Sequence, residues 1–418
     1  MAHYLNENIY AKIETMINPQ TLKGFRDFLP QEAKKRQYVI DKLKRVFELY
    51  GFEPMETPTL EYEELLMGKY GEEADKLVYR FEDKGKRRVA MRYDQTVPLA
   101  RFVAQYQSQL SSPFKRYAIQ PVWRADKPQK GRYREFIMCD IDIVGTTSVL
   151  ADAEIIALVA QAYKELGFIK AKILVNDRKV FEGLPPQAIG IIDKLKKIGE
   201  DGVVEELVAT NNAKDTSDAK NILQSITQQK PTAYISEVIS GIKQLSFDTY
   251  DIVFSPTLAR GLDYYTSTIF EVEIPEVSVG SVCGGGRFDN LIGMFANKQI
   301  PAVGCAFGFD RTIDAMDELQ LFPPEIQSAT TKILVTVFNE GLSEKSLEIT
   351  AQLRSHNIPT EIYIGNAKLE KQLKYADQKG IPYAIIIGPE EIAKNIVILK
   401  DLQKRIQKTM TIENLLRQ

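Results

Sequence analysis

The chain of 418 residues contains very little of the residue types that most often serve as catalytic bases or metal ligands. It has only two histidines, His3 and His356, and neither lies among other reactive residue types. Catalysis by a Ser-His or Cys-His pair is therefore not expected, because such a pair needs an imidazole base. The three cysteines are widely spaced and form no Cys-x-x-Cys pair, which argues against a structural zinc site.

Long apolar runs and an excess of positive charge are also missing. No apolar stretch reaches the roughly 18 residues that a membrane span needs, and the N-terminus does not combine a basic region with an apolar one. We therefore expect a cytoplasmic protein with no membrane partner. The net charge of −2 argues against a nucleic-acid partner held by bulk positive charge. A polyanion would instead have to bind at local clusters of Lys and Arg.

What the chain does contain is enough apolar sequence for two or three globular domains, since 44% of its residues are hydrophobic. Helical spacing predicts amphipathic helices from Ala33 to Tyr50 and from Ile155 to Leu166, each followed by a glycine. Stretches rich in β-formers predict strands at Arg116 to Val122 and Phe136 to Val144. These elements indicate a core that contains a sheet.

Changes of composition along the chain predict four segments. We expect a first part of a sheet-based core over residues 1–169 and an inserted helical domain over 170–247. The second part of the core would follow over 248–325. Alternating strands and helices then predict a small α/β domain over 331–418, preceded by a proline-bearing linker.

The segment from Trp123 to Phe136 is rich in Arg and Lys and separates two predicted strands. It resembles a loop that joins antiparallel strands. Such a loop can hold a triphosphate through bidentate arginine pairs, and it can also meet RNA phosphates. A solvated basic hairpin is the simpler alternative, and the charge run alone does not exclude it.

Two later segments contain charged residues within otherwise apolar stretches of sequence. Arg260, Asp263, Tyr264 and Tyr265 lie close together in a β-rich region, not far from the glycine run Gly284 to Gly286. Buried charges need partners, and glycines let a ligand approach the backbone, so a binding pocket and a structural ion pair are both compatible with this pattern. Asp310 and Arg311 follow another apolar run, where a helix is expected to start and where a buried ion pair is the simpler interpretation.

The order of these segments resembles the class II aminoacyl-tRNA synthetases and, among them, the histidyl-tRNA synthetases. The landmarks are the opening Leu22 to Pro30, the proline Pro58 of motif 1, Arg124 of motif 2, the run Leu258 to Tyr265, and Arg311 of motif 3. Residues 371–377 and 385–391 resemble the anticodon-binding domain of the same enzymes. The resemblance covers nearly the whole chain from Leu22 onward.

This resemblance implies an α+β fold. The expected architecture is a class II synthetase catalytic core with a mixed, mostly antiparallel sheet, a helical insertion domain and a C-terminal α/β anticodon-binding domain. It also implies the activation of L-histidine with ATP and Mg²⁺, followed by transfer to tRNA(His), in a homodimer. No protein base is needed, because the carboxylate that attacks the α-phosphorus is already ionised.

The family's use of the matching positions implies a role for each site residue. Arg260 would be the catalytic cation, and Arg124 would grip the α-phosphate and the histidine carboxylate. The other residues implied to surround the histidine are Asp94, Gln95, Thr96, Met138, Asp142, Tyr264 and Tyr265. Those implied to bind ATP, together with Arg124, are Asp126, Arg132, Phe136 and Arg311. The loop residues Lys127 and Gln129 would meet the tRNA, although both can equally be solvated.

Three positions depart from what is usual in the family. Met138 stands where a glutamine usually touches the substrate, and it cannot hydrogen-bond as an amide does. Phe288 replaces a tyrosine after the glycine run, and Asp310 replaces a glutamate before Arg311. These departures keep open an alternative, namely a catalytically idle, histidine-sensing regulatory subunit of ATP phosphoribosyltransferase built on the same core. An RNA-binding protein without catalysis is a third possibility, but it leaves the core arginines unexplained.

Overall fold

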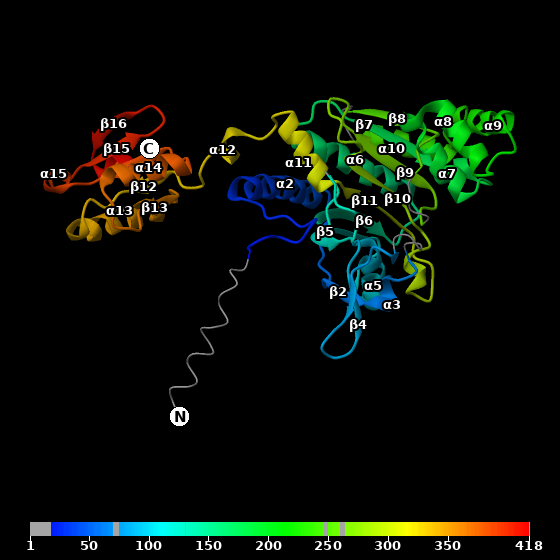
Figure 1. Cartoon of the computed structure of the whole chain (residues 1–418), viewed down its shortest axis with the longest axis horizontal. Coiled ribbons are helices and arrows are strands. Elements are labelled where there is room, and N and C mark those ends of the chain that lie inside the picture. The colour runs from blue at the N-terminus through cyan, green and yellow to red at the C-terminus, as the bar shows by residue number, and fades with distance from the viewer. Residues whose placement is uncertain (1–17, 70–74, 130, 246–249, 260–263, 418) are drawn as a thin grey trace. The chain divides into compact units, whose positions relative to one another are not determined.

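The computed structural model describes residues 18–69, 75–129, 131–245, 250–259 and 264–417. The chain forms two compact units, Met1–Leu321 and Phe322–Gln418. Each is coloured by its place in the sequence in Figure 1. Within the described ranges, no helix has the length and apolar character required to cross a membrane.

An eight-stranded sheet in the order β1-β5-β6-β11-β10-β9-β7-β8 forms the centre of the first unit. All neighbouring strands run antiparallel except β1 with β5 and β7 with β8, so the predicted mixed, mostly antiparallel sheet is confirmed. The strands are β1 (Glu53–Pro54), β5 (Phe114–Trp123), β6 (Glu135–Val144), β7 (Lys172–Asp177), β8 (Asp251–Phe254), β9 (Thr268–Glu273), β10 (Cys283–Arg287) and β11 (Ala302–Phe307).

A smaller sheet in the order β2-β4-β3 lies in the same unit. Its antiparallel strands are β2 (Leu60–Tyr62), β3 (Arg80–Glu82) and β4 (Arg88–Met91). The helices of the unit are α2 (Pro30–Leu49), α3 (Glu63–Leu66), α5 (Thr96–Tyr106), α6 (Val149–Glu165), α7 (Pro186–Ile192), α8 (Leu195–Ala209), α9 (Thr216–Thr227), α10 (Ala233–Leu245) and α11 (Phe309–Glu318). Short 3₁₀ turns are η1 (Gln107–Gln109), η2 (Arg178–Phe181) and η3 (Ile292–Met294).

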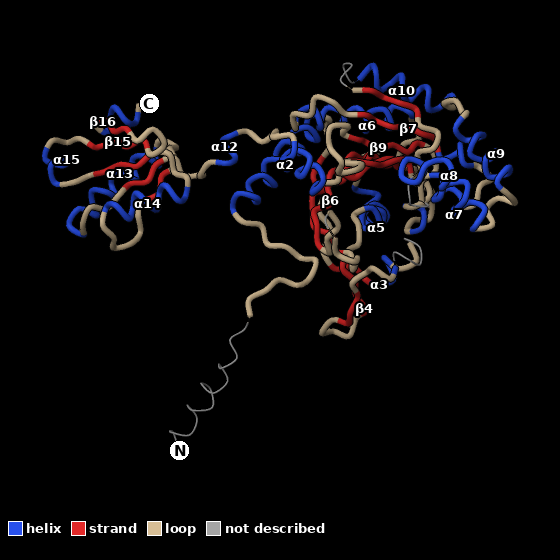
Figure 2. Tube along the Cα trace, turned by 45° about the horizontal axis from the view of Figure 1, so that its top comes forward, coloured by secondary structure: helices blue, strands red, loops and turns tan. Residues whose placement is uncertain are grey.

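Helices α2 and α6 cover one face of the large sheet. The apolar stripe of α2 is buried, and the Phe47 ring lies 5.5 Å from the centroids of both Tyr117 on β5 and Phe307 on β11. Helix α6 packs against α2, α10 and strands β6, β10 and β11. Figure 2 shows α6 and α10 on one side of the sheet and α5 on the other. The opposite face, where α5 begins with Thr96, also holds the cavities of the candidate site.

Local sequence explains where the two predicted helices begin and end. Helix α2 starts at Pro30, and the Glu32 carboxylate accepts a hydrogen bond from the Leu29 N–H at 3.2 Å. Helix α6 starts after Ser148, whose hydroxyl accepts a hydrogen bond from the Leu150 N–H. Gly167, with φ of 95°, follows the end of α6 in a left-handed conformation that favours glycine. The expected helices and their glycine ends are thus confirmed.

Residues 170–247, expected as an inserted helical domain, contain strand β7 and helices α7, α8, α9 and α10. Strand β7 pairs with β8 and β9 inside the large sheet, and α10 packs on α6. Helices α7, α8 and α9 pack in sequence against one another, and their buried side chains, which include Val203, Leu207 and Leu223, belong to the same apolar cluster as Leu99, Ile269 and Phe288. β-formers and an amphipathic helix show that a segment is buried but do not show its partner, so the bounds of this domain stay a prediction.

The second unit is built on a five-stranded sheet in the order β13-β12-β14-β15-β16. Its elements are α12 (Pro324–Gln327), β12 (Ile333–Val335), η4 (Glu340–Leu342), α13 (Ser343–Ser355), β13 (Thr360–Ile362), α14 (Leu369–Lys379), β14 (Tyr383–Ile386), α15 (Pro389–Ala393), β15 (Val397–Asp401), β16 (Ile406–Met410) and α16 (Ile412–Leu416). The expected α/β alternation is confirmed, and strand β16 is an addition. Residues 322–331, expected as a linker, belong largely to this unit.

Candidate active site

The face of the large sheet opposite α2 and α6 carries the candidate site. Phe136, Met138, Asp140 and Asp142 alternate along β6, so their side chains point to the same face. On the neighbouring strands, Ala306 of β11 lies opposite both Asp140 of β6 and Gly284 of β10. The small residues of β10 and β11 leave room above the sheet, and two cavities open there.

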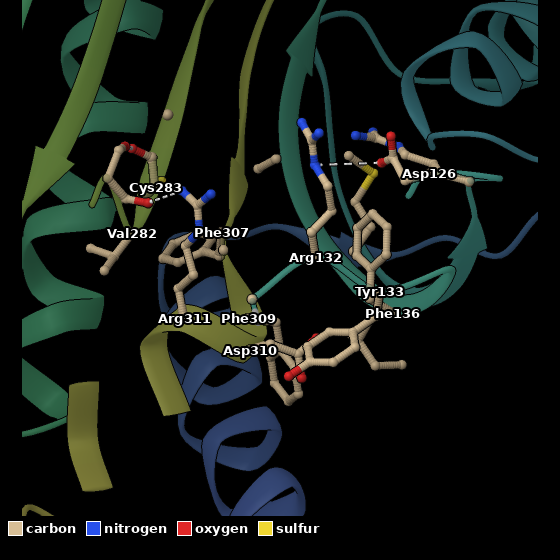
Figure 3. A pocket seen from close by; sticks show the side chains of 18 of the residues that line it. Asp126, Arg132, Tyr133, Phe136, Val282, Cys283, Phe307, Phe309, Asp310 and Arg311 are labelled. Atoms are coloured by element: carbon tan, nitrogen blue, oxygen red, sulfur yellow. Dashed lines mark hydrogen bonds and ion pairs between the residues drawn. The ribbon is translucent and has the colours of Figure 1, made fainter. Parts of the chain in front are cut away.

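The larger cavity, of about 330 Å³, is lined by all five residues expected to bind ATP. These are Arg124, Asp126, Arg132, Phe136 and Arg311. Figure 3 shows Arg132 and Arg311 entering from opposite sides. Its lining also includes Gly131, Tyr133, Ile137, Met138, Glu271, Ser281, Val282, Cys283, Gly284, Ala306, Phe307, Gly308, Phe309 and Asp310.

Arg124 is held in place by backbone and aromatic contacts. Its Nε donates to the carbonyl oxygen of Tyr93 at 3.1 Å. Its guanidinium lies 4.3 Å from the Tyr93 ring centroid and 5.3 Å from that of Phe136. A guanidinium stacked on aromatic rings keeps several N–H groups available for an anion. Arg124 is thus oriented before any ligand binds.

The other two cations are held more loosely. Arg132 Nε lies 3.7 Å from Asp126 Oδ2, and the Arg132 side chain is 59% exposed. Arg311 Nη1 donates to the Ser281 carbonyl oxygen at 2.9 Å. Arg311 does not form the buried ion pair with Asp310 that the sequence left open, since Asp310 pairs with Arg26 and Arg36. Arg311 is thus tied to the backbone through one nitrogen, whereas Arg132 is largely exposed.

The N-terminal segment Lys23–Phe28 braces this cavity, a role that could not be predicted from its residues. Arg134 N–H donates to the Gly24 carbonyl oxygen at 2.9 Å, which ties the segment to the loop after β5. Gly24 has φ of 90°, and a Cβ there would lie 2.9 Å from the Arg134 side chain. The Arg26 guanidinium lies 3.2 Å from the Tyr133 ring centroid and 3.0 Å from Asp310. The segment thus connects motif 2 with motif 3.

The smaller cavity, of about 290 Å³, adjoins the larger one, because Arg124, Met138, Gly284 and Ala306 line both. Most residues expected around histidine line it. These are Asp94, Thr96, Arg124, Met138, Asp142, Tyr264 and Tyr265. The remaining lining residues are Tyr93, Asp140, Gly284, Phe288, Gly304, Cys305 and Ala306. The structure thus brings together residues that are far apart in the sequence.

A buried ion pair forms part of this smaller cavity. Asp142 Oδ2 lies 2.6 Å from Arg116 Nη2, and the Arg116 side chain is fully buried. Burial raises the pKa of Asp142 to about 6, although Arg116 counteracts the shift. Gly304 makes room for the pair, because a Cβ at that position would lie 1.9 Å from Asp142 Oδ1. Sequence reasoning missed Arg116, although its register opposite Asp142 follows once the hairpin is known.

Aromatic rings form another wall of the smaller cavity. The Tyr264 ring centroid lies 4.8 Å from that of Tyr265 and 5.8 Å from that of Phe288, which it meets edge-on. Gly286 permits this packing, because a Cβ there would lie 2.8 Å from the Tyr265 ring. Compared with the tyrosine usual in the family, Phe288 keeps the aromatic packing but lacks the hydroxyl.

Three predicted residues, Gln95, Lys127 and Gln129, line neither cavity. The Gln95 amide donates to the carbonyl oxygens of Met138, at 2.8 Å, and Gln120, at 3.1 Å. Lys127 and Gln129 are exposed on the loop between β5 and β6. Arg260 lies outside the described residues. Among the residues that the structure does describe, no group of three or more His, Cys, Asp or Glu side chains could hold a metal ion.

The mixed sheet, the arginines of the larger cavity and the separate C-terminal α/β unit define the fold and site of a class II aminoacyl-tRNA synthetase. A family model described as histidyl-tRNA synthetase matches residues 24–230 and 194–312. A model of the anticodon binding domain matches residues 332–418. The chain belongs to the histidyl-tRNA synthetase family.

Individual relatives agree with this assignment. The histidine–tRNA ligase of Cytophaga hutchinsonii is 40% identical, over 93% of this chain and 96% of that protein. The histidine–tRNA ligase of Wolinella succinogenes is 39% identical, over 95% of this chain and 97% of that protein. The crystal structure of histidyl-tRNA synthetase from Nostoc sp. PCC 7120 is similar with a TM-score of 0.82 and 29% identity, covering 96% of this chain and 98% of that one.

Proposed function

We propose that the protein activates L-histidine with ATP to form histidyl-adenylate and then transfers the histidyl group to the 3' end of tRNA(His). The observation that carries the proposal is the meeting of two unlike cavities at Arg124. One cavity is lined by arginines and suits a triphosphate, whereas the other is lined by carboxylates and tyrosines and suits a small cationic, aromatic amino acid. Arg124 lines both, so it can contact the histidine carboxylate and the α-phosphate together.

The chemistry requires charge stabilisation more than proton transfer. The histidine carboxylate attacks the α-phosphorus in line, the bond from phosphorus to the bridging oxygen breaks, and pyrophosphate leaves. Arg124 would stabilise charge on the α-phosphate, with Arg132 and Arg311 on the outer phosphates and Phe136 stacked on adenine. We assign Arg260 the role of catalytic cation on the resemblance, because it lies outside the described residues.

Mg²⁺ would enter with ATP as part of the substrate. This ion is usually held by one or two carboxylates together with substrate phosphates. Glu271 on β9 lines the larger cavity on its sheet side, opposite Gly284 in register. Its carboxylate would serve as an oxygen ligand of Mg²⁺, and the positive charge of the ion would offset the negative charge of the phosphates.

Transfer to tRNA would use surfaces beyond the two cavities. The exposed Lys127 and Gln129 lie on the loop beside the larger cavity, where they would meet the acceptor end. The match of residues 332–418 to the anticodon-binding model supports recognition of the anticodon by the second unit. A protein that aminoacylates tRNA would be located in the cytoplasm. The affinity of the protein for tRNA(His) would be compared with its affinity for a truncated tRNA that lacks the 3' end.

We further propose a homodimer. One face of the three-stranded sheet carries exposed apolar side chains, namely Leu60 (42% exposed), Tyr62 (52%) and Phe81 (45%). Tyr62 and Phe81 share this face because both lie opposite Val89. Beside this face lies a cavity of about 680 Å³ lined in part by Pro58. Exposed aromatic and apolar side chains grouped beside the motif 1 proline suit burial by a second copy. A monomeric mass in solution at micromolar concentration would contradict the dimer.

The principal alternative is a histidine-sensing regulatory subunit. A structure titled ATP phosphoribosyltransferase regulatory subunit/histidyl-tRNA synthetase, from Bacillus halodurans, is similar with a TM-score of 0.71 but 20% identity, which supports a common fold only. Two features favour the synthetase: the arginines of the larger cavity and the anticodon-binding unit at 332–418. ATP–pyrophosphate exchange that depends on L-histidine would separate the two, because a regulatory subunit would not catalyse it.

A further inference from the structure

The smaller cavity lacks the amide that the family usually presents at position 138, yet a second polar side chain faces the same space. Met138, Asp140 and Asp142 alternate along β6 and all line this cavity. Asp142 is engaged by Arg116 at 2.6 Å. Asp140, between the two, was not predicted as a site residue.

The residues directly opposite Asp140 on the flanking strands offer no side-chain donor to its carboxylate. Arg116, further along β5, acts on Asp140 electrostatically but is paired with Asp142. Residue 140 is 3% exposed, and its Oδ1 accepts no hydrogen bond within the described part of the chain. Its cross-strand neighbours are Ala118 on β5 and Ala306 on β11, and Gly284 follows Ala306 in the same row. Methyl groups and a glycine cannot donate from their side chains, and their small size leaves space for a ligand beside the carboxylate.

The charges around the cavity favour a ligand that donates hydrogen bonds. Asp94 and Asp142 line the cavity together with Asp140, against the cations Arg116 and Arg124. The Asp94 Oδ1 accepts from the Val97 N–H at 3.1 Å, at the start of α5. A buried carboxylate is costly unless a donor or cation satisfies it. The N–H groups of histidine, on its ammonium and its ring, are donors of this kind.

We propose that Asp140 is a specificity-determining residue, whose carboxylate accepts a hydrogen bond from an N–H of the substrate histidine and supplies the polar contact that Met138 cannot. This inference rests on the proposed function, because it takes the smaller cavity as the histidine site. It adds a residue to that site and explains how the site tolerates methionine at position 138.

Asp140→Asn tests the inference, because asparagine keeps the shape of the side chain and removes its charge. Titration calorimetry with L-histidine should show affinity weakened roughly tenfold or more, as expected when a neutral amide replaces a carboxylate as the acceptor, with the KM for ATP within about twofold. Asp251→Asn, at an exposed position on β8, is the matched control and should change neither quantity. An unchanged affinity for histidine in folded Asp140→Asn protein would overturn the inference.

A second comparison separates recognition from mere support of the fold. Met138→Gln should leave wild-type activity within about tenfold, the value of one neutral hydrogen bond, yet recover part of the histidine affinity lost in Asp140→Asn. Equal losses for histidine and ATP, or no recovery in the double variant, would overturn the inference. If Asp140→Asn does not fold, Asp140→Ser is measured in the same way.

Two further arms complete the experiment. Imidazolepropionate, which lacks the ammonium group, binds wild type and Asp140→Asn equally if Asp140 holds the ammonium, and loses affinity in the variant if Asp140 holds the ring N–H. Wild-type ATP–pyrophosphate exchange is measured in parallel. If wild type catalyses exchange while Asp140→Asn binds histidine normally, the inference fails and the proposed function stands. If wild type binds histidine without exchange, the proposed function fails while the contact of Asp140 remains testable by calorimetry.

Discussion

Arg26 and Asp310 form an ion pair, with Arg26 Nη2 lying 3.0 Å from Asp310 Oδ1. The same guanidinium stacks on Tyr133, so one side chain of the N-terminal segment contacts both the motif 2 loop and the start of α11. Tyr133 and Asp310 line the larger cavity, close to Arg132 and Arg311. The relative position of the two arginines thus depends partly on a residue that itself does not line the cavity.

Loss of this brace is expected to weaken ATP binding selectively. Arg26→Ala should raise the KM for ATP roughly tenfold with a smaller change in the KM for histidine, because misplaced phosphate ligands cost binding and rate. Arg26→Lys should recover part of the loss, since a lysine can still pair with Asp310. Arg45→Ala, at an exposed position on α2, is the control. Equal increases in both KM values would point to a general loss of structure instead.

The buried carboxylate of Asp142 predicts a pH dependence. Burial raises its pKa to about 6, so the carboxylate is charged above that pH and becomes neutral below it. If charged Asp142 holds a cationic group of histidine, kcat/KM for histidine should fall as the pH drops through about 6, because kcat/KM reports the ionisation of the free enzyme and free substrate. The same shift implies that the free energy of unfolding falls as the pH rises from about 4 to about 6, because the folded state holds this proton more tightly.

A control is needed because the imidazole of free histidine titrates in the same range. The calorimetric affinity of Asp142→Asn for histidine should keep only the part of the pH dependence that belongs to the substrate. The KM for ATP should stay level across this range. A pH profile for histidine that is identical in wild type and Asp142→Asn would rule out Asp142 as the titrating group.

Gly304 is predicted to be required for the geometry of the smaller cavity. A Cβ there would lie 1.9 Å from Asp142 Oδ1 and 2.5 Å from the Ile141 carbonyl oxygen. Gly304→Ala should lower the free energy of unfolding by about 1–3 kcal/mol through overpacking and should also weaken histidine binding. Gly190→Ala, in α7 with nothing within 4 Å of the added Cβ, should be neutral or stabilising by up to about 1 kcal/mol. Similar melting temperatures for the two variants would show that the site can relax.

Arg260 is expected to act mainly in the transition state. Arg260→Ala should lower the rate of adenylate formation far more than it weakens histidine binding, because negative charge at the α-phosphate grows as the carboxylate attacks. Single-turnover kinetics and calorimetry on the same preparation would measure the two quantities. Comparable losses in rate and affinity would identify Arg260 as a ground-state ligand of histidine.

Much of the fold and site could be predicted from the sequence where local pattern was sufficient. The β5–β6 hairpin followed from β-rich stretches around a polar loop, and the residues that the motif positions implied for ATP line one cavity. Strand β16 was missed because most of its side chains are exposed and it carries no apolar alternation. Arg116 and Asp140 were missed because only strand register shows which charged residues share a face.

The role of the opening segment was also beyond sequence reasoning. The run from Leu22 to Pro30 served as a family landmark, but nothing in its composition revealed that Gly24 lies against Arg134. The contacts of Gln95 could not be predicted for a similar reason, since its neighbours Asp94 and Thr96 line the smaller cavity whereas its amide donates to the backbone of β5 and β6. Contacts between distant segments are set by the assembled sheet and not by local spacing.

The most direct measurement of the proposed function is ATP–pyrophosphate exchange by the purified protein with each of the twenty amino acids in turn, in the presence of Mg²⁺. We expect exchange with L-histidine and none above background with the other nineteen. Exchange with a different amino acid, or its absence with histidine in folded protein, would contradict the assignment of the two cavities to ATP and histidine.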